Sequence, residues 1–286
     1  MKWIFLFCLF FSSLAIADEL SLAQPLKNPI LLVHGATMGG GRLIVGPFDL
    51  GEYFLHVPEL LRSSKTEVST VDLPSDATIE ECAMVLKSFL EKNMAGKKVN
   101  IIAHSLGGLD ARYLVSVLHS NQVVSITTIG SPHRGTPLAD WGFKQVNERG
   151  SWYYTFRILG YDLVGRRFLK ELTTEFMAKQ FNPRVPDRSD IKYFSVVTTG
   201  EMFTRTMSPL LYPTYYWIRS MQGQMAEEPN DGIVPLSSQS WGKEIARLNL
   251  DHLSQMGHDS FRFFSLEQES IKLYSLIYKE LQSSGL

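Results

Sequence analysis

The sequence predicts an α/β fold in which helices flank a mostly parallel central sheet on both faces. Segments of strand character alternate with amphipathic segments between residues 29 and 129, a pattern typical of parallel sheets. Ser105 stands at one junction between a strand-like and a helix-like segment, and two glycines follow it closely. Two aromatic-rich stretches, residues 137–185 and 202–225, then interrupt the alternation and predict helical insertions.

Short apolar segments mark the expected strands. They cover residues 29–34, 66–72, 99–104, 124–129 and 191–198. Residues 66–72 alternate between apolar and polar side chains, whereas residues 29–34 form the continuous apolar run of a strand buried on both faces.

Apolar residues at helical spacing mark the expected helices at 78–94 and 106–119, with a weaker candidate at 53–61. Thr78 and Glu81 have the spacing of a capping box, which favours a helix start at this point. A last amphipathic helix has Ser265 and Gln268 flanking its start. One face of that helix carries Ile271, Tyr274, Ile277, Tyr278 and Leu281.

Composition and charge describe an ordinary globular protein. The 286 residues are 44% hydrophobic and 20% charged, with a formal net charge of −1. No cluster of basic residues is long enough to mark a nucleic-acid surface. We therefore expect no nucleic-acid partner.

The N-terminus has the features of a secretory signal peptide. Lys2 supplies a positive charge, residues 3–14 are almost wholly apolar, and Ala15 and Ala17 fit a small-x-small cleavage site. The apolar run is shorter than a membrane span needs, although an uncleaved anchor is the alternative. We expect cleavage after Ala17, a secreted or periplasmic product, and no stable membrane span after cleavage.

The mature chain, residues 18–286, is expected to form a single domain that carries both insertions. Cys82 is its one remaining cysteine, so an internal disulfide is excluded. A core of this size stabilises an exported protein without one. The helical spacing around Cys82 predicts a buried position.

Residues 99–108 are typical of a nucleophile elbow, the sharp strand-to-helix turn that exposes a serine at the top of an α/β-hydrolase sheet. An apolar strand stops at Ser105, and the turn needs small residues two positions before and two after it. Ala103 and Gly107 meet that need. A small-x-Ser-x-Gly string alone is common, so the remaining residues of the site carry the prediction.

A serine nucleophile needs a base that takes its proton and an acid that orients the base. In this fold the chain order is serine, acid, histidine. Asp231, in an Asn-Asp-Gly turn, is the candidate acid, with a solvent-exposed turn as the alternative interpretation. His252 is the candidate base, and His258 is held in reserve.

Five regions of the chain carry a resemblance to a known family. They are 29–35 (PILLVHG), 99–113 (VNIIAHSLGGLDARY), 125–141 (SITTIGSPHRGTPLADW), 172–183 (LTTEFMAKQFNP), and the motifs at 230–232 and 251–253. In these regions the chain resembles the bacterial secreted true lipases, the triacylglycerol lipases of the α/β-hydrolase superfamily typified by Pseudomonas and Burkholderia enzymes. The eight residues 130–137 are the most specific part of this resemblance.

The resemblance implies a role for each site residue. Ser105 would be the nucleophile, Asp231 the acid and His252 the base. The backbone N–H groups of Ala36 and Leu106 would form the oxyanion hole. Both insertions are candidates for a lid and an acyl pocket, and family members use the first of these regions as a lid. An ordinary packed pair of helices is the alternative interpretation, and no residue of the pocket is assigned.

The sequence departs from the family at a metal site. Family members commonly bind a structural calcium ion through acidic residues upstream of the triad acid and two positions after the histidine. Here Ser254 occupies the latter position, and no aspartate lies between Glu201 and Asp231. We therefore expect no metal at this site and no cofactor. What holds the histidine loop in place is left open.

The predicted function is a secreted serine hydrolase of carboxylic esters, with triacylglycerol as the first-choice substrate. Alternatives with the same triad are a phospholipase or acyltransferase and a short-chain esterase. A non-catalytic relative is the least favoured interpretation, because such proteins usually lose a triad member. The expected partners are an acyl-ester substrate at a lipid–water interface and, as a candidate, a dedicated folding chaperone.

Overall fold

The structure is a computed structural model that describes residues 20–36, 41–45, 48–148, 167–204, 206–220, 228–258 and 268–286. The predicted signal peptide, residues 1–17, lies outside these ranges. Parts of both predicted insertions, residues 149–166, 205 and 221–225, also lie outside them. None of the helices in the described ranges is long and apolar enough to cross a membrane.

Within the described residues, six parallel strands form one sheet in the order β4-β1-β5-β6-β7-β8. The strands are β1 (Ile30–Val33), β4 (Val68–Val71), β5 (Val99–His104), β6 (Val123–Ile129), β7 (Lys192–Thr198) and β8 (Lys243–Leu248). The chain adds β4 on one side of β1 and β5 to β8 on the other. Such a reversal opens a crevice at the carboxyl ends of the strands.

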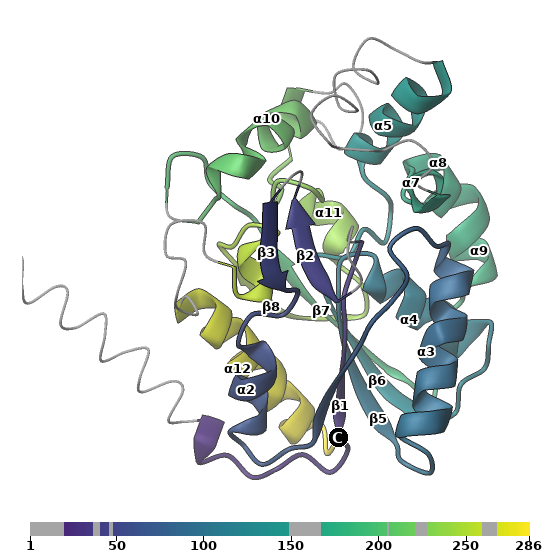
Figure 1. Cartoon of the computed structure of the whole chain (residues 1–286), viewed down its shortest axis with the longest axis vertical. Helices are drawn as coiled ribbons and strands as arrows, with labels where there is room; N and C mark the ends of the chain where they lie inside the picture. Colours follow the sequence, from purple (N-terminus) through teal and green to yellow (C-terminus); the bar gives the residue numbers. More distant parts are fainter. Residues whose placement is uncertain are drawn as a thin grey trace, which may run out of the picture.

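Helices cover both faces of this sheet, as predicted (Figure 1). Helices α2 (Val57–Arg62) and α12 (Gln268–Ser283) lie over one face, and α3 (Ile79–Asn93) and α4 (Gly107–Ser116) lie over the other. Because side chains alternate along a strand, Leu32 joins the core under α2 and α12 while Leu31 joins the core under α3 and α4.

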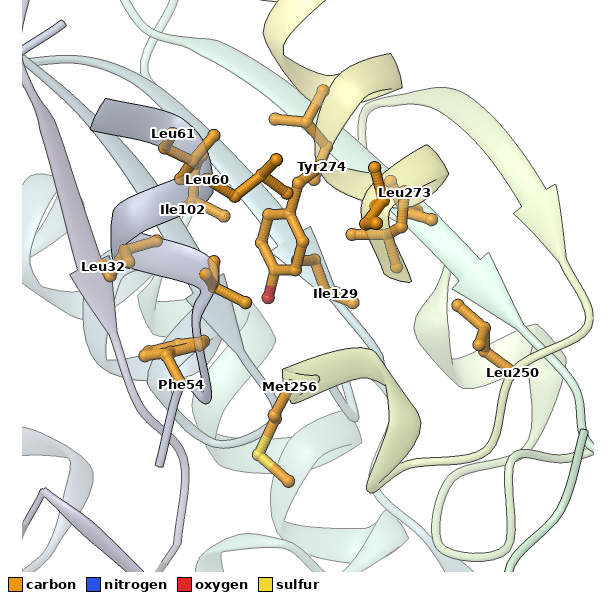
Figure 2. Close-up of a cluster of buried hydrophobic side chains, with 14 of the residues drawn as sticks. Leu32, Phe54, Leu60, Leu61, Ile102, Ile129, Leu250, Met256, Leu273 and Tyr274 are labelled. Atoms are coloured by element: carbon orange, nitrogen blue, oxygen red, sulfur yellow. The ribbon is translucent and has the colours of Figure 1, made fainter. Parts of the chain in front are cut away.

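The core under α2 and α12 also supports the loop that follows β8. Figure 2 shows the ring of Tyr274, from α12, among apolar side chains that include Leu60, Ile102 and Ile129. The buried Tyr274 hydroxyl donates a 2.9 Å hydrogen bond to the backbone oxygen of Gln255. Helix α12 therefore contributes apolar packing and one polar anchor to the same loop.

The sequence-based boundaries hold to within a few residues for most elements. Helix α3 begins with the predicted capping box, in which Thr78 and Glu81 exchange side-chain hydrogen bonds with each other's backbone. Cys82 lies buried in that helix. The weak helix candidate at 53–61 is shorter than expected: α2 begins only at Val57, with Pro58 in the first turn, where a missing N–H costs nothing.

Three features of the fold were not predicted: a hairpin, a short helix and an edge strand. Strands β2 (Arg42–Val45) and β3 (Phe48–Glu52) form an antiparallel hairpin, and α11 (Leu236–Gln239) is one short turn. Strand β8 is the third; it lies at the end of the sheet's strand order, and most of its residues are exposed or half-buried. A strand of this kind lacks the continuous apolar run that marks β1 and β5.

The insertions are helical, as predicted. The described part of the first contains α5 (Pro137–Glu148), α7 (Arg167–Glu171), α8 (Thr174–Phe176), a π-helical turn (Met177–Phe181) and α9 (Asn182–Arg184). The second contains a 3₁₀ turn (Pro209–Leu211) and α10 (Tyr212–Ser220). The rings of Trp141 and Trp217 meet edge to face, with centroids 3.7 Å apart, and so join α5 to α10. Both helices lie at the top of Figure 1.

Candidate active site

Ser105 lies at the turn between β5 and α4. Its backbone is left-handed, with φ of +54°, a conformation that costs energy for a residue with a side chain. Hydrogen bonds from Ser105 N to the oxygen of Ile129 (2.9 Å) and from Gly108 N to the oxygen of Ser105 (3.1 Å) hold the turn. This is the strained geometry of a nucleophile elbow.

Two glycines allow the end of β1 to lie against this turn. A Cβ atom at Gly107 would come within 2.5 Å of the backbone oxygen of His34. One at Gly35 would come within 2.6 Å of the Cβ of Ser105. The small residues of the motif are therefore needed for close contact between neighbouring strand ends.

His252 lies in the loop after β8, in contact with Ser105. Its Nε2 is 3.0 Å from the Oγ of Ser105, and its Nδ1 is 2.8 Å from the Oδ2 of Asp231. Because the Asp231 carboxylate can only accept, Nδ1 carries the proton and Nε2 faces the hydroxyl as the acceptor. This tautomer is the one that a general base needs.

Asp231 is fully buried, which excludes the alternative of a solvent-exposed turn. Its Oδ1 accepts hydrogen bonds from the backbone N–H groups of Ile233 (3.0 Å) and Val234 (2.7 Å). Its Oδ2 accepts from His252 and, at 2.8 Å, from the side-chain amide of Gln255. The carboxylate is thus held on both oxygens and aimed at the imidazole.

His258, the reserve base, lies elsewhere. Its Nε2 is hydrogen-bonded to the backbone oxygens of Glu52 (2.9 Å) and Tyr53 (3.1 Å). This ring nitrogen is occupied by two carbonyl acceptors, so the ring ties the loop after β8 to the end of the β2–β3 hairpin.

The two predicted oxyanion donors lie on either side of the elbow. Leu106 follows Ser105 directly, and Ala36 follows Gly35, which lies against Ser105. Across the described part of the chain, neither the N–H of Ala36 nor that of Leu106 donates to a protein acceptor.

A second polar group beside the triad was not predicted. The His104 ring lies 4.5 Å, centroid to centroid, from the His252 ring. Its Nε2 is 2.8 Å from the Oε1 of Gln255, and its Nδ1 is 2.7 Å from the hydroxyl of Tyr53. Burial holds the pKa of His104 well below its ordinary value, and the neighbouring His252 adds to this. The ring is therefore neutral beside the catalytic candidate.

Asp251 holds the loop after β8, which carries His252, in place. Its buried carboxylate accepts from the backbone N–H groups of Leu253 (3.1 Å), Ser254 (2.7 Å) and Ser208. Burial raises the pKa of Asp251. Because Ser208 precedes α10, this one side chain joins the histidine loop to the second insertion.

The residues at the family's calcium position do not fit a calcium ion. Ser254 offers a neutral hydroxyl, and its backbone oxygen already accepts a 2.6 Å hydrogen bond from Ser270. No group of three or more His, Cys, Asp or Glu side chains within the described ranges is arranged to hold a metal. Backbone N–H groups that donate to the Asp251 carboxylate anchor this loop.

The most specific stretch of the resemblance, residues 130–137, has a structural part. Arg134 Nη1 donates to the backbone oxygens of Ser237 (2.7 Å) and Ser240 (2.9 Å). The buried Arg112 guanidinium lies 3.6 Å from the centroid of the Trp241 ring, and Trp241 stacks on His133. Burial lowers the pKa of Arg112 to about 10. These contacts brace the segment that follows Asp231.

Comparison with known proteins was made by family, by sequence and by structure. Residues 76–159 match the family described as "PGAP1-like alpha/beta domain". The chain is 32% identical over 219 residues to triacylglycerol lipase 2 of Saccharomyces cerevisiae, an alignment that covers 71% of this chain and 61% of the yeast protein. The chain thus spans less than two thirds of that relative's length.

A bacterial relative aligns over more of its length. The chain is 27% identical over 292 residues to a triacylglycerol lipase of Vibrio cholerae, with 91% of this chain and 89% of the relative covered. The crystal structure of Staphylococcus hyicus lipase superposes with a TM-score of 0.68 at 18% identity, covering 92% of this chain and 98% of that one. The predicted α/β-hydrolase fold is confirmed.

Proposed function

We propose that this α/β-hydrolase, a homologue of the bacterial triacylglycerol lipases, hydrolyses carboxylic esters through a covalent acyl-enzyme on Ser105. The observation that carries the proposal is the hydrogen-bonded line from Ser105 Oγ to His252 and on to the buried Asp231. A line of this kind, ending at a serine on a strained turn, is what nucleophilic catalysis requires.

The proposed reaction has two halves. In the first, Ser105 Oγ attacks the ester carbonyl carbon while His252 Nε2 takes the hydroxyl proton; the carbon–oxygen bond to the alcohol then breaks, and His252 returns the proton to the alcohol. In the second, water attacks the acyl-serine, His252 takes the water's proton, and Ser105 leaves with it. Both tetrahedral intermediates would place their oxyanion between the N–H groups of Ala36 and Leu106.

Exposed apolar residues on the second insertion favour a lipid ester as the substrate. Of five large apolar side chains that are well exposed in the described ranges, three lie here: Phe203 (85% exposed), Tyr216 (68%) and Leu210 (50%). Apolar side chains gathered on one exposed segment suit contact with a lipid–water interface. The two insertions, joined through Trp141 and Trp217, would form the lid and acyl pocket.

Replacing Phe203 and Tyr216 by serine tests this surface. We expect the double variant to lose several-fold of its rate on emulsified triacylglycerol, because less apolar surface enters the interface. Its rate on a soluble short-chain nitrophenyl ester should match the unaltered protein, since no hydrogen bond or ring contact within the described ranges joins either residue to the triad. An equal fall on both substrates, or no fall on the emulsion, would contradict the interfacial role.

The proposal extends to the location and partners of the protein. The N-terminal signal would direct export, with cleavage after Ala17 and a secreted or periplasmic product of residues 18–286. The substrate would then be an acyl ester met at a lipid surface. A dedicated folding chaperone is a candidate partner for a protein of this class.

A substrate panel tests the activity and separates it from its rivals. Purified protein is assayed on nitrophenyl esters of increasing chain length, emulsified triacylglycerol, phospholipid, and ester with an alcohol acceptor. Ser105→Ala should lose at least about a thousandfold in kcat, because the nucleophile is gone. The control Ser275→Ala, which removes a buried hydroxyl on α12 that has no hydrogen-bond partner among the described residues, should keep its rate.

The outcome of the panel decides among the candidates. Hydrolysis of long-chain triacylglycerol, rising above the solubility limit, supports the lipase. Preference for phospholipid or transfer to the alcohol would point to a phospholipase or acyltransferase, and activity on soluble short chains alone to an esterase. Full activity of Ser105→Ala would refute the assignment of the nucleophile.

A further inference from the structure

We infer that Gln255 is a positioning residue for the triad: its amide aligns the Asp231 carboxylate and links it through His104 to Tyr53, beside the predicted oxyanion loop. The inference rests on the proposed serine mechanism. It concerns three buried side chains that the resemblance assigns to no role. Gln255 and His104 are each held by side-chain hydrogen bonds on two sides, and Tyr53 is held by its bond to His104.

The direction of each hydrogen bond in the series from Asp231 through Gln255 and His104 to Tyr53 follows from the Asp231 carboxylate. Asp231 can only accept, so the amide nitrogen of Gln255, not its oxygen, faces Oδ2. The amide oxygen must then accept from His104, which places the His104 proton on Nε2. Its Nδ1 is left as an acceptor, and the hydroxyl of Tyr53 donates to it.

Hydrogen bonds and steric contacts fix the conformation of the Gln255 side chain. Its second N–H donates to the Oγ1 of Thr198 at 2.6 Å, so both donors and the acceptor are used. A Cβ atom on Gly130 would clash with the amide, and Gly130 has a φ of +57° that favours glycine. The backbone of Gln255 is fixed by its own N–H to Asp251 (3.2 Å) and by the Tyr274 hydroxyl at its oxygen (2.9 Å).

Tyr53, at the end of this series of hydrogen bonds, lies beside the loop that carries the predicted oxyanion donor Ala36. The Tyr53 hydroxyl lies against Gly35, the residue before Ala36: a Cβ atom at Gly35 would come within 2.8 Å of it. The same chain of bonds therefore touches the carboxylate that orients the base and the loop that carries a predicted oxyanion donor. Fully satisfied buried networks of this kind rigidify a site.

Two consequences for the proposed reaction follow. The Asp231 Oδ2 atom receives a fixed donor beside the imidazole N–H, so its lone pairs stay oriented while His252 gains and loses a proton. His104, held as a neutral donor to Gln255, brings no positive charge to the ring that must become positive. Loss of the Gln255 amide should therefore slow the chemical steps more than it weakens substrate binding.

The chain offers a matched control for mere packing. Gln239 is also fully buried, and it makes three bonds: from Thr198 N to its oxygen, and from its nitrogen to the oxygens of Thr198 and Val234. It contacts neither Asp231 nor a histidine through these bonds. Gln255→Met and Gln239→Met thus remove the same polar group from the same kind of environment.

The kinetic test compares the two methionine variants. For Gln255→Met we expect kcat on a soluble ester to fall about 10- to 100-fold, the range for a lost hydrogen bond to a buried charge, with KM within about threefold. Gln239→Met should lose thermal stability to a similar degree and keep its kcat. Unchanged kcat in Gln255→Met, or an equal fall in Gln239→Met, would overturn the inference.

A spectroscopic test on the unaltered protein needs no activity. Nitrogen-15 NMR of the imidazole rings, with His104 assigned by its absence in His104→Asn, should show His104 as the neutral Nε2–H tautomer at pH 7. An Nδ1–H tautomer or an imidazolium would reverse the hydrogen bonds and overturn the inference. If Ser105 proved inert towards fluorophosphonate and esters, the proposed function would fail while this result still fixed the direction of the bonds.

Discussion

Asp231 and His252 were predicted from chain order and motif. In the structure, the hydrogen bonds at their side-chain atoms explain how each side chain is oriented. The Asp231 carboxylate is buried and takes two backbone N–H bonds on one oxygen, so it is held before the imidazole arrives. His252 presents Nε2 to Ser105 only because Nδ1 is committed to that carboxylate. Replacing the Asp231 carboxylate by an amide of the same shape therefore changes the preferred tautomer of the His252 imidazole.

For this reason we expect Asp231→Asn to reduce kcat by about a thousandfold to ten-thousandfold while the protein still folds. The asparagine amide would favour the opposite imidazole tautomer and leave no acceptor facing Ser105. Steady-state kinetics on a soluble ester measure this, with circular dichroism to check the fold. His252→Ala should fall by a similar factor, and an active His252→Ala would show that another group acts as the base.

The sequence predicted the three candidate triad residues but not the residues around them. Ser105, Asp231 and His252 stand in motifs that can be read locally. Gln255 and Tyr53 stand in no motif, and their roles arise only when β5, the hairpin end and the loop after β8 meet. His104 is part of the elbow string, yet nothing in the string shows that its ring would face His252.

At the scale of elements, local signals decided which parts of the fold could be predicted. Strands β1 and β5 carry uninterrupted buried residues, β6 is buried except for the half-buried Val124, and α3 carries a capping box, so each was visible in the sequence. Strand β8 was missed because its exposed and half-buried residues give no buried run. The β2–β3 hairpin was missed because the glycine-rich segment before it resembled a loop.

The loop after β8 depends on one carboxylate. Three backbone N–H groups donate to the two oxygens of the Asp251 carboxylate, whereas an asparagine amide has a single oxygen. Asp251→Asn would therefore put an amide N–H against a backbone N–H of Ser208 or Ser254. We expect a loss of about 2 to 3 kcal/mol in the free energy of unfolding, measured by urea denaturation, and a lower kcat as His252 becomes less well placed.

Asp49→Asn is the matched control for that experiment. Asp49 pairs with Arg42 in an exposed position, where solvent screens the interaction. Its unfolding midpoint should stay close to that of the unaltered protein. An Asp251→Asn midpoint equal to that of Asp49→Asn would show that the loop is held by other contacts.

Across the whole molecule, buried histidines set the response to acid. Burial holds the pKa values of His34, His104, His133 and His258 below 6.5, so these rings bind protons less readily in the folded protein than in the unfolded chain. The unfolded chain binds protons on them as the pH falls below 6.5, which favours unfolding. Burial raises the pKa of carboxyl groups such as Asp110, and these act in the opposite direction: they make the folded protein less stable as the pH rises.

We therefore expect the unfolding temperature to fall as the pH is lowered from 7.5 to 5. Each such histidine contributes up to about 1.4 kcal/mol per pH unit within its window. His258→Asn should show a smaller fall over the same range, because one titrating ring is gone. His119→Asn, at an exposed position, is the control. A constant unfolding temperature from pH 7.5 to 5 would contradict this account.

The central claim is that Ser105 is an activated nucleophile, and mass spectrometry of the folded protein after treatment with a fluorophosphonate tests it most directly. The account predicts a single covalent adduct on the peptide that contains Ser105, and much slower labelling in His252→Ala. An unlabelled protein, or an adduct on another serine with Ser105 untouched, would contradict it.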